Sequence, residues 1–162
     1  MEEPSLPRFL CDVMLARLAR WLRAAGYDTA LAAPDAPDDA LVRRAVLEDR
    51  WLLTLDRQIA DHRAGRGRVI VLEHGPVAVQ AARLAETLAL DWLARPFSRC
   101  LLDNALLTPA SPHAVSRLPA RVQAEASGFA ACPACGRIYW AGSHHRRMHA
   151  TLTAWQDAAV SR

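Results

Sequence analysis

Three aspartates in the first third of the chain occupy positions that suit a divalent-metal site. Asp12 follows the apolar run at 8–11, Asp38 begins the segment at 38–56, and Asp56 ends that segment directly after a second apolar run. Carboxylates at strand ends and helix starts converge where a divalent metal can bind, which indicates phosphodiester chemistry. The alternative is that each aspartate is a helix N-cap, because a carboxylate accepts a hydrogen bond from a free backbone N–H.

Arginines accompany these aspartates. All 20 basic residues of the chain are arginine, and Arg17, Arg20 and Arg23 recur every third residue in the first expected helix. Arg57 follows the third aspartate. The planar guanidinium group matches phosphate, so arginines beside acidic metal ligands are typical of an enzyme that acts on nucleic acid. The alternative for the stripe at 17–23 is a solvated helix face.

The composition indicates a folded chain without a membrane segment. With 162 residues, of which 52% are hydrophobic, the chain can form one ordinary domain or a domain with a small appendage. No apolar run approaches the roughly 20 residues that span a bilayer, and the acidic, proline-containing N-terminus is unlike a signal peptide. We therefore expect a cytoplasmic protein with no membrane contact.

Strand and helix patterns alternate through residues 8–89. The apolar runs predict strands at 8–12, 27–31, 51–55 and 69–72. The helical periodicity predicts helices at 14–25, 39–49, 58–63 and 77–89. Gly26 should end the first helix, and Asp38 should cap the second. The apolar face of this second helix comprises Leu41, Val42, Ala45 and Val46.

Such alternation predicts an α/β fold with a parallel sheet flanked by helices. Ligands of these sheets bind beyond the carboxyl ends of the strands. Asp12 and Asp56 would both lie at such ends, so the expected topology favours the same pair that the residue types indicated.

Cysteines mark a second part of the chain, which begins near residue 98. Cys132 and Cys135, followed by Gly136, have the spacing of a zinc knuckle, which supplies half of a tetrahedral site. Cys100 and Asp103 have the same spacing and can supply the other half, because zinc accepts carboxylate oxygen. The alternatives are a redox pair and a degenerate site without metal. We divide the chain accordingly into residues 1–98 and 99–162.

Two further features concern cysteine and histidine. Cys11, inside the first expected strand, should be a buried core thiol. The segment 140–149 contains three of the six histidines and two arginines, which would contact a nucleic-acid backbone or substitute as a metal ligand. The alternative is the exposed start of a C-terminal helix capped by Ser143.

Four blocks of the sequence carry a family resemblance. They are FLCDVMLARLARWLRAAGYDT, PDDALVRRAVLEDRWLLTLDR, SRCLLDNALL and FAACPACGRIYWAGSHHRRM. In this order they resemble successive motifs of the Mut-seven C-terminal RNase domain family, over about residues 8 to 149. That family has a PIN-like nuclease fold with a zinc ribbon at its C-terminal end. The resemblance therefore implies a PIN-like parallel sheet flanked by helices, with a small C-terminal zinc-ribbon-like unit.

The resemblance implies a metal-dependent ribonuclease that hydrolyses RNA phosphodiester bonds. Asp12, Asp38 and Asp56 match the acidic positions that bind Mg²⁺ or Mn²⁺, with Asp39 as the substitute for Asp38 if the register differs by one. The products would carry a 3′-hydroxyl and a 5′-phosphate. Two other functions fit the same residues, namely a non-catalytic RNA-binding module and a toxin-type PIN ribonuclease paired with an antitoxin.

The resemblance also implies RNA contacts and a structural zinc ion. Arg20, Arg23 and Arg57 match basic positions that would hold substrate phosphate. Tyr139 and Trp140 of the ribbon would stack on bases, or form the core of the small unit. The family has cysteine where this chain has Asp103. The implied zinc ligands are thus Cys100, Asp103, Cys132 and Cys135.

Overall fold

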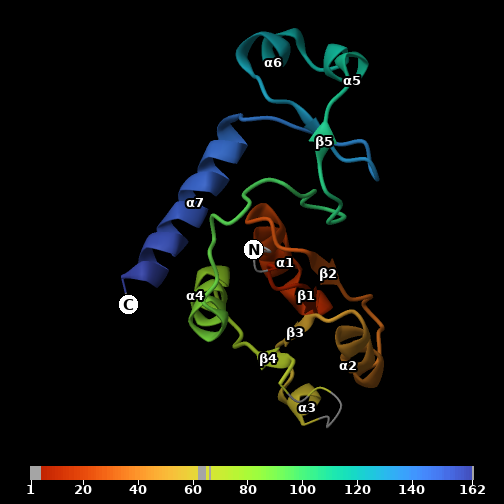
Figure 1. The fold of residues 1–162 in the computed structure, drawn as a ribbon, viewed down its shortest axis with the longest axis vertical. Helices are drawn as coiled ribbons and strands as arrows, with labels where there is room; N and C mark the ends of the chain where they lie inside the picture. The colour runs from red at the N-terminus through yellow and green to blue at the C-terminus, as the bar shows by residue number, and fades with distance from the viewer. Residues whose placement is uncertain (1–4, 62–64, 66, 162) are drawn as a thin grey trace.

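The computed structural model describes residues 5–61, 65 and 67–161, and a parallel sheet lies in the lower half of the view, between α4 and α2 (Figure 1). Its strands are β1 (Phe9–Cys11), β2 (Thr29–Leu31), β3 (Trp51–Thr54) and β4 (Val69–Val71). They lie in the order β2-β1-β3-β4, and every neighbouring pair is parallel. The predicted α/β class is confirmed.

Helices cover both faces of this sheet. A 3₁₀ turn, η1 (Val13–Leu15), leads into α1 (Ala16–Ala24), and the later helices are α2 (Asp38–Leu47), α3 (Arg57–Ala60) and α4 (Val77–Leu88). One core cluster joins the sheet to α1 and α4, and a second joins it to α2 and α3. The sheet is therefore the middle layer of three.

The two clusters follow from the alternation of side chains along a strand. In β1, Phe9 and Cys11 enter the cluster under α1 and α4, whereas Leu10 enters the cluster under α2 and α3. In β3, Leu53 enters the cluster under α1 and α4, and Leu52 enters the cluster under α2 and α3. Cys11 is fully buried as predicted, and this burial raises the pKa of its thiol to about 12.

The turn after α1 requires glycine. Gly26 has φ of 98°, in the region that favours glycine, and a Cβ there would overlap the carbonyl oxygen of Arg95. This close approach lets the N–H of Arg95 donate to Ala25 O and the N–H of Phe97 donate to Ala24 O. The predicted end of the first helix at Gly26 is confirmed, and the turn also fixes the segment 95–97.

The second and third helices differ from expectation at their ends. Pro37, in an extended conformation, is the N-cap of α2, so Asp38 is its first helical residue and the predicted cap is wrong. Val46 is 48% exposed and lies outside the apolar face, which is formed by the buried Leu41, Val42 and Ala45. The helix expected at 58–63 is α3, and its expected end falls at residues 62–64, outside the described residues.

The C-terminal part forms a small antiparallel sheet and a long helix. The strands are β5 (Thr108–Pro109), β6 (Ala130–Ala131) and β7 (Ile138–Tyr139), and α5 (Pro112–Ser116) and α6 (Ala120–Glu125) lie between β5 and β6. The chain ends in α7 (Ser143–Val160), whose N-cap is Gly142, so the predicted Ser143 cap is wrong. No helix within the described ranges is long and apolar enough to cross a membrane.

Helix α7 returns from the small sheet to pack against α4 (Figure 1). Its Met148 and Leu152 belong to the same core cluster as α1 and α4. The ring centroid of Trp155 lies 5.0 Å from that of Trp21 and 5.0 Å from that of Trp92. Residues on both sides of the expected boundary at 98 therefore share one core, and the division into two domains stays a prediction.

An ion-pair network joins the beginnings of the strands. Asp28, just before β2, accepts hydrogen bonds from Arg50 Nη1 at 2.8 Å, Arg8 Nε at 3.0 Å and Asn104 Nδ2 at 2.7 Å. Burial alone would raise the pKa of Asp28, but the hydrogen bonds from Arg50 and Asn104 outweigh it and hold this pKa well below its usual range.

We predict that Asp28→Asn lowers the free energy of unfolding at pH 7 by about 2 kcal/mol, because the buried Arg50 then keeps only one of its two anionic partners, Glu48. The folded-state pKa is depressed, so this contribution is fully present above about pH 4, near the pKa of an unfolded Asp, and is lost as the pH falls further. Urea denaturation at a series of pH values measures the difference. A difference that stays constant from pH 7 to pH 3 would contradict the prediction, and Asp35→Asn in an exposed loop is the matched control.

Candidate active site and metal centre

Asp12 and Asp56 lie at the carboxyl ends of β1 and β3, which are neighbours in the sheet. The N–H of Asp12 donates to Leu53 O at 2.9 Å and extends the pairing of the two strands. The buried Thr54 hydroxyl donates to Asp12 Oδ2 at 3.1 Å, and its oxygen accepts from the N–H of Asp56 at 3.0 Å. One hydroxyl thus fixes both aspartates. Thr54 was missed in the sequence, where the only signal is a polar residue inside the apolar run at 51–55.

The helix-cap alternative holds for Asp56 alone. Its Oδ1 accepts a hydrogen bond from the N–H of Gln58 at 2.8 Å and caps α3. Asp12 precedes η1 but makes no side-chain cap, and Asp38 is inside its helix. Asp56 therefore has a structural role whether or not it binds metal.

Asp38 lies at the start of α2, on the side of the sheet where Asp56 begins α3. Helix α2 follows β2 and runs back to the beginning of β3, so its first residue faces the carboxyl edge. Asp38 is exposed, while the neighbouring Asp39 is engaged in an ion pair of 2.7 Å with Arg43. The carboxylate oxygens of the three aspartates do not all lie within 4.8 Å of one another. Among the described residues, one group of potential metal ligands is that compact, and it lies elsewhere in the fold.

The three candidate phosphate-binding arginines have different environments. Arg20 on α1 and Arg57 at the start of α3 are exposed. Arg23 is only 6% exposed, and its guanidinium donates to Thr29 O at 2.9 Å, Leu101 O at 3.1 Å and Leu102 O at 2.7 Å. Burial lowers the pKa of Arg23. Arg23 is therefore committed to backbone carbonyls, and the expectation that it holds substrate phosphate is not carried forward.

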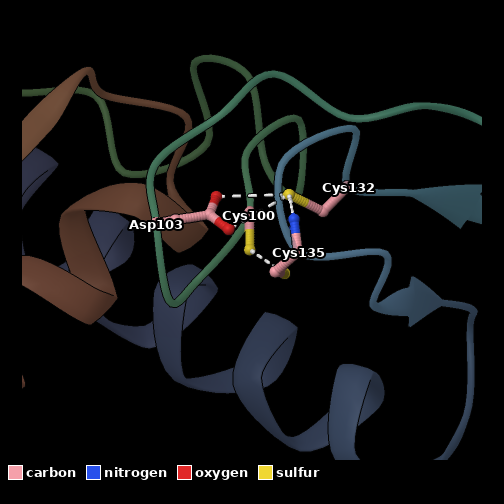
Figure 2. Close-up of side chains that lie close together, drawn as sticks. All are labelled: Cys100, Asp103, Cys132 and Cys135. Atoms are coloured by element: carbon pink, nitrogen blue, oxygen red, sulfur yellow. Dashed lines mark hydrogen bonds between the residues drawn. The ribbon is translucent and has the colours of Figure 1, made fainter.

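Figure 2 shows a second cluster, in which side chains from two loops point toward one another. Cys100 and Asp103 come from the loop after α4, and Cys132 and Cys135 come from the turn between β6 and β7. Their ligand atoms all lie within 4.8 Å of one another. The structure thus brings together all four residues that the spacing predicted, and they could hold a metal ion such as zinc. No histidine of the described residues joins them, so the predicted histidine substitute is not present in this group.

The distance between two of the sulfur atoms matches that expected in a tetrahedral zinc site. Zinc–sulfur bonds of about 2.3 Å place two tetrahedral sulfurs about 3.8 Å apart. The Sγ atoms of Cys100 and Cys135 are 3.8 Å apart. Cys132 Sγ lies 3.2 Å from both carboxylate oxygens of Asp103, so the carboxylate faces the cluster.

Hydrogen bonds within the cluster shift the pKa values of its ligands in both directions. Burial alone would raise the pKa of the Cys100 thiol, but a hydrogen bond from the Tyr139 hydroxyl at 3.1 Å, with backbone N–H groups, lowers it. The thiols of Cys135 and Cys132 donate to Asp103 and lower the pKa of its carboxyl to about 2. A backbone N–H alone would lower the pKa of the Cys135 thiol, but its hydrogen bonds to Asp103 and to the other thiols raise that pKa to about 12. Metal binding requires deprotonated ligands, so these contacts favour that state at Cys100 and Asp103 and oppose it at Cys135.

Buried contacts position the loop that carries Cys100 and Asp103. Arg23 binds the carbonyls of residues 101 and 102, and Tyr139 OH accepts from the N–H of Leu101 at 3.1 Å. Asn104 adopts φ of 72°, which Asn tolerates, and its Oδ1 accepts from the N–H of Thr29 at 2.9 Å. None of these roles was predicted, because each contact joins residues far apart in the sequence.

Fold and site together define an α/β protein with acidic side chains at the carboxyl edge of a parallel sheet and a cysteine–carboxylate cluster in its C-terminal part. The family model of the Mut7-C RNAse domain matches residues 7–152, nearly the whole chain, and the chain belongs to this family. The resemblance identified from the sequence is thereby confirmed. No curated protein and no solved structure matched the chain. The family name is that of a ribonuclease domain and indicates a nuclease or RNA-related function.

We predict that the purified protein binds one zinc ion and that the ion stabilises the fold, by about 2.7 kcal/mol when free zinc is 100 times the dissociation constant. Removing zinc with a chelator should lower the melting temperature, and Cys132→Ser should abolish both the binding and the effect. Cobalt substitution should give the absorption bands of a tetrahedral thiolate site. Asp103→Cys should bind zinc more tightly and Asp103→Ala more weakly. Unchanged affinity in Asp103→Ala would show that the carboxylate is not a ligand.

Proposed function

We propose that the chain is a metal-dependent ribonuclease that hydrolyses RNA phosphodiester bonds and leaves a 3′-hydroxyl and a 5′-phosphate. Asp12, Asp38 and Asp56 would bind its catalytic metal. The observation that carries the proposal is the Thr54 hydroxyl, which joins Asp12 to the backbone of Asp56 across the two central strands. Membership in a ribonuclease-domain family supports the reaction class. The position of these residues beyond the carboxyl ends of parallel strands supports the location.

The donor set fits magnesium or manganese. Both ions prefer hard oxygen ligands, and magnesium is commonly bound through one or two carboxylates with water and substrate phosphate completing the shell. Asp12 and Asp38 keep their carboxylates free of a cap, and Asp56 uses only Oδ1 in its own. A bound ion would lower the pKa of a water ligand and neutralise charge on the scissile phosphate.

The protein's own residues would position this site and the substrate. Thr54 holds the Asp12 carboxylate in place by donating to it. Arg57, exposed and next to Asp56, is placed to bind a neighbouring phosphate, and Arg20 lies further along α1. We propose RNA as the substrate and assign Arg23 no part in binding it.

We predict that labelled single-stranded RNA is cleaved with magnesium or manganese and not with chelator, and that Asp12→Asn, Asp38→Asn and Asp56→Asn each lower the rate at least about 100-fold. That factor corresponds to a loss of about 3 kcal/mol of transition-state stabilisation. Asn preserves the hydrogen bond from Thr54 at position 12 and the helix cap at position 56, so melting temperatures should stay close to wild type.

The control for this measurement is Asp61→Asn at the other end of α3, which should leave the rate unchanged. Comparison of Asp38→Asn with Asp39→Asn identifies the second acid. RNA binding without cleavage, insensitive to magnesium and to Asp12→Asn, would instead support a non-catalytic RNA-binding module. Growth arrest on expression, relieved by an inhibitor encoded nearby, would support the toxin-type ribonuclease.

We predict that Thr54→Val lowers kcat about 10- to 100-fold, the range seen when a partner of a metal ligand is removed. Val preserves the buried shape but cannot donate to Asp12 or accept from the N–H of Asp56. The Michaelis constant for RNA should change little, because Thr54 is fully buried and does not face the substrate. Thr54→Ser should restore activity, and failure of that rescue would show that the hydroxyl does not position the aspartates.

A further inference from the structure

A further candidate site lies where α1, the strand β7 of the small antiparallel sheet and the start of α7 meet. It is a hollow with a volume of about 260 Å³. Arg20 of α1 and Phe97 border it on one side, Arg137 to Trp140 on another, and the first turn of α7 on a third. This volume lies just below the range of about 300 to 1,000 Å³ typical of pockets for drug-sized molecules. A single planar ring system is the size of ligand that it can hold.

The lining of the hollow has one sign of charge. It includes Arg20, Arg137 and two histidines, and none of its thirteen residues is acidic. Both arginines are exposed, and neither side chain forms an ion pair or hydrogen bond with another residue of the described chain. The larger hollow between α4 and α7, about 750 Å³, contains Glu73 and Glu86 and lacks this complementarity to an anion. The smaller hollow therefore favours an anionic ligand.

Aromatic and apolar side chains form the floor and rim of the same hollow. Trp140 is half-buried and packs over Gly142, where a Cβ would come within 2.9 Å of Trp140 Nε1. The ring of Phe97 lies 4.0 Å from that of His145. Leu102, 52% exposed, stands at the rim. Half-buried aromatic rings that border a hollow beside unpaired arginines can bind single-stranded nucleic acid, with bases against the rings and phosphates on the cations.

We propose that this hollow is a subsite for one nucleotide of single-stranded RNA, with the base against Trp140 and the adjoining phosphate between Arg20 and Arg137. This inference rests on the proposed function and assigns where the RNA lies outside the cleavage site. We assign no base to Tyr139, because its ring packs against the core and its hydroxyl binds Cys100 and the N–H of Leu101. Of the two aromatics that the sequence offered, Trp140 is the base-stacking residue.

Helix α1 sets the distance from this subsite to the aspartates. Arg20 is eight residues after Asp12, through η1 and the first five residues of α1, which corresponds to a rise of about 14 Å. At 3.4 Å per stacked nucleotide, this separation spans about four nucleotides. The exposed Arg17, one turn before Arg20, lies between them. RNA that extends about four nucleotides from the scissile bond would reach the subsite.

The test is binding of fluorescein-labelled single-stranded RNA of about twelve nucleotides by anisotropy, in the full chain carrying Asp12→Asn so that no cleavage occurs. We expect Trp140→Ala to weaken binding at least about 5-fold, the lower end of the range for one stacked base, and Trp140→Phe to restore it. Arg137→Ala should weaken binding and reduce the slope of log K against log salt by about 0.7, the value for one phosphate contact on a single strand. Trp140→Ala should leave that slope unchanged.

Arg83→Ala, an exposed arginine of α4 outside the hollow, is the matched control and should bind like the parent. Zinc content and melting temperature, measured in parallel, separate loss of the subsite from loss of the ribbon, and the exposed Arg137 keeps the test valid if Trp140→Ala unfolds. Binding within 2-fold of the parent for both Arg137→Ala and Arg20→Ala, or for a folded Trp140→Ala, would overturn the subsite. If wild type does not cleave RNA but Trp140→Ala and Arg137→Ala still weaken RNA binding, the proposed nuclease site is wrong and the subsite is supported.

Discussion

The buried guanidinium of Arg23 is the contact on which the arrangement of the two parts depends. It extends from α1, binds the carbonyl of Thr29 in β2, and binds two carbonyls of the loop at 101–102. A buried arginine without these acceptors would carry a large desolvation cost, so the loop is held where it satisfies the cation. Asn104 completes the connection by accepting from the N–H of Thr29. Both backbone groups of Thr29, the first residue of the edge strand β2, are thereby satisfied by side chains, which hinders pairing with another strand at that point.

This same loop carries Cys100 and Asp103, so the candidate metal centre is held against the sheet. Tyr139 of β7 contacts both Cys100 Sγ and the N–H of Leu101, and it brings the turn with Cys132 and Cys135 against the loop. Helix α7 then runs from the small sheet to α4, with Trp155 between Trp21 and Trp92. The C-terminal part is therefore attached to the sheet at both of its ends. A structural change at the candidate metal centre should shift the residues that line the hollow beside Trp140, because Tyr139 contacts Cys100 and also lines the hollow.

Helix α1 connects the three candidate regions. Its buried residues Leu18 and Leu22 fix it against the sheet, and its exposed face carries Arg17 and Arg20. The helix begins just beyond Asp12 and passes the hollow, so a nucleic-acid strand that lies along it would meet cations throughout. The aspartates supply the anionic end of this path, where a divalent cation would offset their mutual repulsion.

Local patterns in the sequence determined the elements and the donor atoms. Apolar runs that alternate with helical periods of about 3.6 residues predicted the parallel α/β sheet. The strand ends placed Asp12 and Asp56 on one edge, and cysteine spacing selected the ligand cluster. The tertiary structure decided what each polar residue does. Arg17 and Arg23 look alike in the sequence, but six residues turn a helix by about 600°, so the two side chains lie about 120° apart around α1. One faces solvent and the other faces a loop almost 80 residues away in the chain. No local pattern records that loop, because the contact exists only after the chain has folded.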